Sequence, residues 1–316
     1  MYRKILVPLD GSPFAEQSLA RAGALAVAHH ATIILVMVHH VPTPNFAPDG
    51  VWLDVSGLEA ELRTQQQQYL EKIGTELVEK FNIAVNCELL DAPTASTICA
   101  YAQSHGVDLI ALTTHGRTGF SRAWLGSVAD GIVRQSVVPV LLLRPHANGA
   151  SPRPDATAGG AFNRILVPLD GSHEAELAIH HAAALGRATN ADYVLARIVA
   201  PVPMIPTNVP LDFIASGLPV DSVATARCLL EARLYLAVQV VALKSNGCVS
   251  QVETQVRLAT EVAPALIALA ESESVDAIAM TSHGRGASRL FVGSVADKIL
   301  RGSNAAVLLF HPHSHS

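Results

Sequence analysis

The sequence carries an internal repeat that limits the folds open to it. Residues 3–12, RKILVPLDGS, recur as NRILVPLDGS at residues 163–172. Residues 113–130, TTHGRTGFSRAWLGSVAD, recur as TSHGRGASRLFVGSVAD at residues 281–297. Two copies of the same segments in the same order indicate two structural units of like fold within one polypeptide.

The length and composition of the chain fit two globular domains. At 316 residues the chain is long enough for two cores of ordinary size, and 50% of its residues are hydrophobic while 16% are charged. We predict domains at residues 1–145 and 162–312. Residues 146–161 lack hydrophobic periodicity and are predicted to form the linker.

Short apolar runs alternate with segments of helical periodicity in both halves. Because strands that alternate with helices form parallel sheets, each half is predicted to be an α/β domain of Rossmann-like or flavodoxin-like type. We expect a five-stranded parallel sheet of order 3-2-1-4-5 with helices on both faces. The strand-like runs lie at residues 3–10, 32–39, 84–90, 108–113 and 138–144, and again at 164–172, 193–200, 251–258, 276–281 and 305–310.

The second predicted helix differs in character between the halves. Residues 58–81 include ELRTQQQQYLEKIG, whereas residues 220–245 include LLEARLYLAVQVVAL. Because apolar residues on a helix usually face the core, we expect the later helix to cover more buried surface than its counterpart.

The ends of the predicted strands contain groups suited to a mononucleotide. In open α/β sheets ligands bind outside the carboxyl ends of the strands, and these ends carry Asp10 and Asp170, which suit ribose hydroxyls or an adenine amine. Glycines at 116, 119 and 126 allow backbone amides to approach an anion. Ser127 and Ser294 each open a helix whose N–H groups suit phosphate.

Simpler explanations exist for the same residues. A glycine after a strand is often only a turn, and a serine before a helix is often only an N-cap. His115 and His283 would suit general acids, although a loop histidine more often packs or contacts phosphate. The sequence contains no GxxxxGK[ST], GxGxxG or GxSxG motif and no convincing catalytic base.

The combined pattern closely resembles the universal stress protein family. The resemblance rests on KILVPLDGS, the Ala-rich first helix, THGRTG followed by GSVAD, and PVLLLR, and it covers both halves. Nucleotide-binding members carry the signature G-x2-G-x9-G-[ST], which wraps the ribose and phosphates of ATP. The resemblance and the strand-end pattern together assign nucleotide binding to Pro8, Asp10, His40, Thr113, Gly116, Arg117, Gly119, Gly126, Ser127 and Val128, and to Pro168, Asp170, Ile198, Thr281, Gly284, Arg285, Gly293, Ser294 and Val295.

Both copies depart from the family signature. Thr113 and Thr281 stand where the first glycine belongs, and a threonine fits there only if the backbone stays extended. In the second copy eight residues, not nine, separate Gly284 from Gly293. That deletion would either tighten the phosphate cradle or push the phosphates out.

The resemblance implies an ATP-binding stress-response protein that acts through nucleotide occupancy and assembly with little or no turnover, with Mg²⁺ or Mn²⁺ bound through the phosphates. A slow ATP hydrolase or nucleotidyl-transfer enzyme assisted by His115 or Arg117, and a protein-interaction module without nucleotide, are the alternatives. Family members commonly pair through their last strands, which implies an internal pseudo-dimer of the two halves and further association into a homodimer.

The remaining expectations concern partners and location. The net charge of -5 disfavours nucleic acid as a partner. The charge-free window at residues 22–41 changes from an Ala-rich helical pattern to a β-branched one, so we do not predict a membrane span. The sequence starts on a strand-like run without a signal-peptide pattern, and its four cysteines lack CxxC spacing, so we expect a cytoplasmic protein.

Overall fold

The computed structural model describes residues 2–39, 56–91, 94–114, 125–144, 162–204, 220–248, 250–282 and 292–311. Its internal contacts divide the chain into two compact units, residues 1–162 with 306–316, and residues 163–305. The last strand of the chain therefore groups with the first unit. The predicted linker at residues 146–161 lies outside the described residues.

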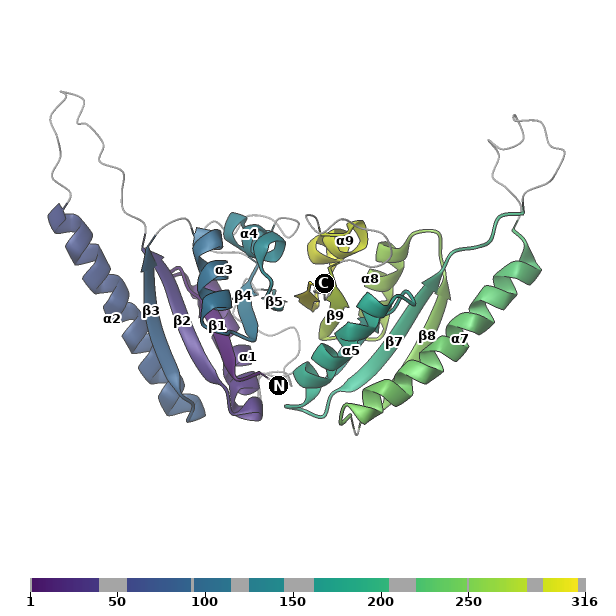
Figure 1. Cartoon of the computed structure of the whole chain (residues 1–316), viewed down its shortest axis with the longest axis horizontal. Helices are drawn as coiled ribbons and strands as arrows, with labels where there is room; N and C mark the ends of the chain where they lie inside the picture. The colour runs from purple at the N-terminus through teal and green to yellow at the C-terminus, as the bar shows by residue number, and fades with distance from the viewer. Residues whose placement is uncertain are drawn as a thin grey trace, which may run out of the picture. The chain divides into compact units, whose positions relative to one another are not determined.

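The first unit is built on a parallel sheet with the strand order β3-β2-β1-β4-β5, as predicted (Figure 1). The register pairs Ile33 of β2 with Val85 of β3, and Ile110 of β4 with Val140 of β5. The described elements are β1 (Lys4–Pro8), α1 (Pro13–His29), β2 (Thr32–His39), α2 (Ser56–Phe81), β3 (Val85–Asp91), α3 (Thr94–Ser104), β4 (Leu109–Thr113), α4 (Ser127–Gln135), β5 (Val140–Leu143) and β10 (Ala306–Phe310).

β10 joins the first unit as an antiparallel strand beside β5. Val307 pairs with Leu142 and Leu308 with Leu141. Beyond this strand, His311 Nε2 lies 2.7 Å from the carbonyl oxygen of Val133 in α4. The expected pairing of the two last strands is therefore present within the chain, with antiparallel direction.

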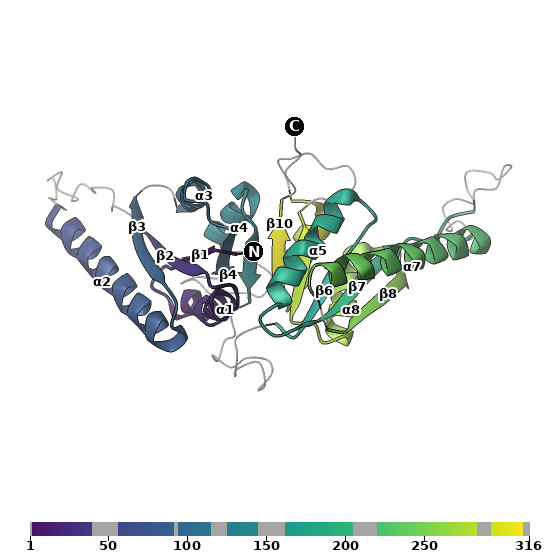
Figure 2. The same cartoon turned by 60° about the horizontal axis from the view of Figure 1, so that its bottom comes forward.

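The second unit repeats the arrangement of the first four strands, in the order β8-β7-β6-β9, and Figure 2 shows β6, β7 and β8 side by side. Its strands pair in parallel, with Ile165 of β6 beside Tyr193 of β7 and beside Ala277 of β9. The predicted α/β fold with two like halves is confirmed. The described elements are β6 (Arg164–Pro168), α5 (His173–Gly186), β7 (Asp192–Val199), α7 (Ser222–Ser245), β8 (Val252–Leu258), α8 (Val262–Ser272), β9 (Ala277–Thr281) and α9 (Ser294–Gly302).

Helices cover both faces of the sheet in the second unit. The guanidinium of Arg197 lies 5.0 Å from the ring centre of Tyr235 in α7, whereas the next residue, Ile198, lines a pocket with Val262 of α8. Because successive residues of a strand point to opposite faces, α7 and α8 lie on opposite sides of the sheet. The inner strands β6 and β9 are apolar and largely buried, which is typical of parallel sheets covered twice, whereas the edge strand β8 carries Glu253, Gln255 and Arg257 and has no buried residue.

The apolar residues that prompted the expectation for α7 lie mostly outside its buried face. Leu236 and Leu243 of α7 are fully buried, but Val223, Leu234 and Val241 are 80%, 62% and 65% exposed. Residues 18 apart complete five turns of helix, so Val223 and Val241 share the face that points away from the sheet. The additional apolar residues of α7 therefore face solvent.

Candidate functional site

A cavity of about 220 Å³ lies at the carboxyl ends of β1 and β4 in the first unit. It has an apolar floor, a carboxylate at one side and the start of α4 at another. The sequence predicted Pro8, Asp10, Thr113, Gly126, Ser127 and Val128 for this site, and the structure brings all six together. The described residues around it are Pro8, Leu9, Asp10, Ala15, Val38, Thr94, Ile98, Leu112, Thr113, Thr114, Gly126, Ser127, Val128 and Ala129.

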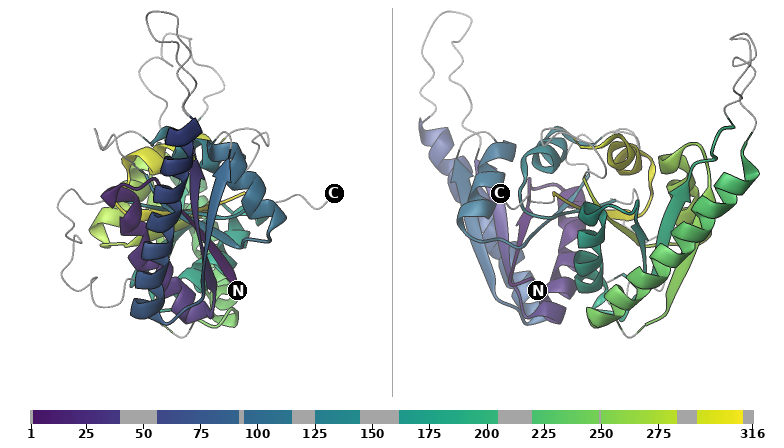
Figure 3. Two further views of the ribbon diagram at one scale, coloured as in Figure 1. Left: turned by 90° about the vertical axis from the view of Figure 1, so that its left-hand side faces the viewer. Right: turned by 45° about the vertical axis from the view of Figure 1, so that its right-hand side comes forward.

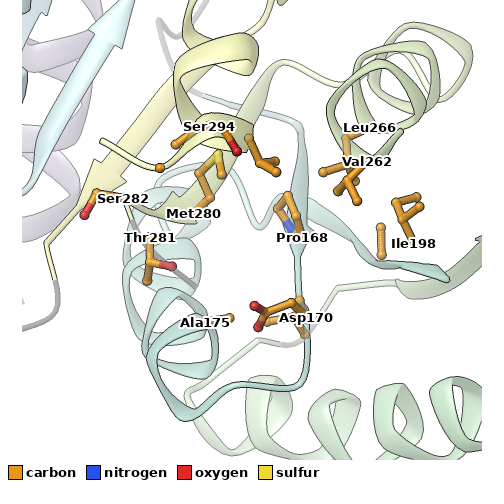
Figure 4. Close-up of a pocket in the computed structure, with 15 residues that line it drawn as sticks. Pro168, Asp170, Ala175, Ile198, Val262, Leu266, Met280, Thr281, Ser282 and Ser294 are labelled. Atoms are coloured by element: carbon orange, nitrogen blue, oxygen red, sulfur yellow. The ribbon is translucent and has the colours of Figure 1, made fainter. Parts of the chain in front are cut away.

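The second unit has a matching cavity of about 330 Å³ (Figure 4). Pro168, Asp170, Ile198, Thr281, Gly293, Ser294 and Val295 line it, as the sequence predicted. In the close-up, Asp170 and Ser294 approach the cavity from the loop after β6 and from the start of α9, with Leu266 of α8 forming part of another wall.

A tight turn holds each carboxylate at its cavity. The Ser12 backbone N–H donates to Asp10 Oδ1 at 2.9 Å, and the Ser172 N–H donates to Asp170 Oδ1 at 2.9 Å. Gly11, between Asp10 and Ser12, has a φ of 78°, a left-handed conformation that favours glycine. The DGS sequence thus forms a turn, as the simpler explanation held, and the same turn positions the carboxylate.

The helices that begin at the cavities differ from their neighbours in capping. The hydroxyl of Ser12 accepts from the Ala15 N–H at the start of α1, which satisfies one amide of the first turn. By contrast, α4 and α9 have Gly126 and Gly293 as N-caps, and neither N-cap makes a side-chain hydrogen bond. The first-turn amides of α4 and α9 consequently present a positive dipole end to the cavities.

The threonines in place of the first signature glycine fit without strain. Thr113 and Thr281 are the last residues of β4 and β9, and both are buried. Extended backbone accepts a Cβ, so the condition that the sequence set for these positions is met.

The shortened second loop begins and ends in the same way as the first. The Gly126 N–H donates to the Thr114 carbonyl oxygen at 2.8 Å, and the Gly293 N–H donates to the Ser282 carbonyl oxygen at 2.8 Å. The one-residue deletion therefore leaves the strand-to-helix connection at both ends of the loop unchanged.

Several predicted residues lie outside the part of the chain that the structure describes. They are His40, Gly116, Arg117, Gly119, Gly284 and Arg285, together with the loop histidines His115 and His283.

Sequence reasoning missed one wall of each cavity. Thr94 and Ile98 of α3 line the first cavity, and Val262 and Leu266 line the second. Their spacing of four residues places each pair on one helix face, but only the sheet topology brings that face over the strand ends.

The residues that the sequence assigned to the site from the second strand of each half are not equivalent positions. Sequence reasoning paired His40 with Ile198, whereas Val38 takes the place in the first cavity that Ile198 takes in the second. Aligning the two apolar runs from Thr32 and Asp192 identifies this correspondence.

The described residues also bear on metals and membranes. Within them no group of three or more His, Cys, Asp or Glu side chains is placed to hold a metal ion. None of the described helices is long and apolar enough to cross a membrane.

Comparisons with known proteins follow the two-unit organisation. A universal stress protein of Methanocaldococcus jannaschii is 30% identical over 145 residues, covering 46% of this chain and 83% of that protein. A universal stress protein of Mycolicibacterium smegmatis is 23% identical over 313 residues, covering 98% of this chain and 97% of that protein. The crystal structure of a universal stress protein from Archaeoglobus fulgidus aligns with a TM-score of 0.68 at 19% identity over 98% of each chain.

The sequence model of the universal stress protein family matches residues 1–144 and again residues 161–311. The two matches follow the internal repeat and the two cavities. The chain therefore belongs to the universal stress protein family and carries two copies of its domain.

Proposed function

We propose that each half binds ATP in its cavity and that the protein acts in a stress response through nucleotide occupancy and assembly, with little turnover. The observation that carries the proposal is the same in both halves. A carboxylate held by a DGS turn faces a helix N-terminus that lacks a side-chain cap, across a floor of apolar side chains.

The first cavity offers a separate environment for each part of the nucleotide. Val38, Ile98 and Leu112 give apolar contact for adenine. Asp10 is placed to accept hydrogen bonds from ribose hydroxyls. The first turn of α4 offers backbone N–H groups and a positive dipole end to the phosphates, and Mg²⁺ or Mn²⁺ would be held through those phosphates.

The chemistry of the described walls favours binding over turnover. Asp10 is the one titratable side chain among the described residues that line the first cavity, and the Ser12 amide already occupies one of its oxygens. A carboxylate held in this way suits a fixed acceptor better than a general base.

The two cavities are expected to differ in affinity for the same nucleotide. Val262 in the second stands where Thr94 stands in the first, so the second lacks one hydroxyl on this wall. The second cavity also has the larger volume. A hydroxyl lining a cavity can bond a polar edge of a base, whereas a valine at the same place can only pack against it.

The experiment is titration calorimetry with Mg-ATP on the full chain and on Asp10→Ala, Asp170→Ala and the double variant. We expect two sites in the wild type, one in each single variant and none in the double variant. Glu76→Ala is the matched control, since Glu76 is an exposed carboxylate paired with Lys72 in the half of α2 that leads to the amino end of β3. Flat titrations of the wild type, together with no adenine nucleotide released on denaturation, would rule the proposal out.

The same samples separate binding from the alternative activities. Chromatography of the added nucleotide after several hours is expected to recover intact ATP. Steady release of ADP or AMP that His115→Ala abolishes would support a hydrolase or nucleotidyl-transfer enzyme instead.

A further inference from the structure

The solvent face of α7 carries a row of large apolar side chains. Val223, Leu230, Leu234, Val238 and Val241 are between 56% and 80% exposed. In the part of the chain that the structure describes, no element lies over this face (Figure 3). We call these five residues the α7 stripe.

The equivalent helix of the first unit has no such stripe. Leu70 and Leu77 of α2 are buried like Leu236 and Leu243 of α7, which sets the alignment of the two helices. With that alignment, the stripe positions are occupied in α2 by polar or small residues, namely Gly57, Thr64, Gln68, Lys72 and Thr75. The repeated fold therefore does not itself require apolar residues on this face.

Four of the five stripe residues are arranged symmetrically about Ala232. Leu230 and Leu234 stand two residues to either side of Ala232, and Val223 and Val241 stand nine residues to either side. All four point away from the sheet, whereas Ala232 is buried beneath the helix. Reversing the helix end to end consequently places leucine on leucine and valine on valine.

The positions between these pairs also complement each other in size. Arg227 stands five residues before Ala232, and the small, exposed Ala237 stands five residues after it. Val238 stands six residues after Ala232, opposite Ala226 at six residues before it. The Arg227 guanidinium is held against Glu231 of its own helix at 2.9 Å, which satisfies its charge beside an apolar contact.

The exposed area is sufficient for a specific contact between two copies. From their exposed fractions, the five residues present roughly 500 Å² of surface per copy, so they supply at most roughly 1,000 Å² in a pair, which is about the lower bound for a specific interface. A monomeric protein rarely leaves a patch of this size uncovered without a function.

We propose that the α7 stripe is the contact surface for a second copy of this chain, with the two α7 helices packed antiparallel across a twofold axis near Ala232. In such an isologous contact, Leu230 of each copy meets Leu234 of the other, and Val223 meets Val241. The contact uses neither cavity, so it does not depend on the proposed nucleotide binding.

The first test is sedimentation velocity of the full chain without nucleotide at 1–100 µM. We expect the wild type to sediment with the mass of two chains. Leu230→Glu combined with Leu234→Glu is expected to weaken association at least about 100-fold, because two charges would face each other in an apolar contact. The matched control is Thr64→Glu with Gln68→Glu in α2, which is expected to leave association unchanged.

Folding of the variants is checked by far-ultraviolet circular dichroism, which should match the wild type because all four positions are exposed. The unfolding midpoint does not serve here, because loss of association lowers it by itself. A monomeric wild type over the whole concentration range would overturn the proposal. Equal association of the wild type and the Leu230→Glu/Leu234→Glu variant would overturn it as well, since the contact would then use another surface.

The second test is of direction and register, by disulfide trapping with diamide as the oxidant. A mixture of Val223→Cys and Val241→Cys chains is expected to form a covalent pair. Val223→Cys alone is expected to form none, because the two Val223 positions would lie about 27 Å apart. The wild type, oxidised in parallel, controls for the four native cysteines. Rapid trapping of Val223→Cys with itself would indicate parallel helices and overturn the antiparallel arrangement.

Discussion

The backbone N–H of Gly126 donates a 2.8 Å hydrogen bond to the carbonyl oxygen of Thr114, which ties the start of α4 to the end of β4. Gly126 is also the N-cap of α4, and its backbone, with φ of -59° and ψ of 151°, accepts any side chain. The use of glycine here leaves the helix N-terminus open toward the cavity and without a side chain that competes for its amides.

Capping α4 with a side chain is expected to change stability and binding in opposite directions. Gly126→Asn and Gly126→Asp should each stabilise the fold by a few tenths of a kcal/mol, because both side chains cap helices well. Both should weaken Mg-ATP binding at the first site, and the aspartate more, by at least about tenfold, since it adds a charge beside the phosphates. Thermal unfolding and calorimetry of the two variants make the comparison. Equal affinity in both variants would argue against phosphate at this helix.

Removal of the last strand is expected to disrupt the first unit. A chain that ends at residue 303 lacks β10, so the buried strand Val140–Leu143 becomes an edge, and the contact of His311 with Val133 is lost. We expect a lower unfolding midpoint for the first unit and self-association through β5, measured by calorimetry and light scattering. A chain that ends at residue 311 is the control. A monomeric truncated chain with an unchanged midpoint would contradict the assignment of β10 to the first unit.

Two glycines are expected to respond to alanine in opposite directions. A Cβ at Gly23 in α1 would lie 2.5 Å from Cε2 of Phe81, so Gly23→Ala should cost about 1–3 kcal/mol of stability. A Cβ at Gly57 in α2 would meet nothing within 4 Å, so Gly57→Ala should stabilise by up to about 1 kcal/mol. Urea unfolding of both variants measures the difference. A neutral Gly23→Ala would mean that the Phe81 ring moves aside freely.

Stability is expected to fall below neutral pH because of His181. Burial, with His180 acting in the same direction, lowers the pKa of His181 from 6.5 to about 4. Between these values the unfolded chain binds more protons than the folded chain, so the free energy of unfolding decreases as the pH falls through this window. At pH 5 the loss is about 2 kcal/mol. Urea unfolding at pH 7 and pH 5 should show a drop larger by this amount in the wild type than in His181→Leu. Equal drops would exclude His181 as the cause.

Most of the fold could be predicted from the sequence because its determinants are local. The strand Lys4–Pro8 contains the apolar run ILVP, and the repeat places a second copy at Arg164–Pro168. Alternation with helices then predicts parallel pairing. Because ligands of open α/β sheets bind outside the carboxyl ends of the strands, the sequence pointed to Asp10 and Ser127, and the structure brings both to one cavity.

The α3 and α8 walls could not be predicted in the same way. Thr94 and Val262 reach the cavities because the first turns of α3 and α8 lie beside the carboxyl ends of the strands. No short-range sequence pattern encodes that position. The side of the sheet on which each helix packs is likewise set by the whole topology.

The sequence by itself determined that two like domains exist, that each has a parallel sheet, and that the repeated DGS and GSVAD segments meet at strand ends. Only the tertiary structure decided that β10 groups with the first unit beside β5, because strand pairing depends on which edges remain open after folding. It also decided that the additional apolar residues of α7, among them Val223, Leu234 and Val241, face solvent. When a helix is apolar on two sides, its sequence does not indicate which side is buried. In the structure the buried side is the one that carries Leu236 and Leu243.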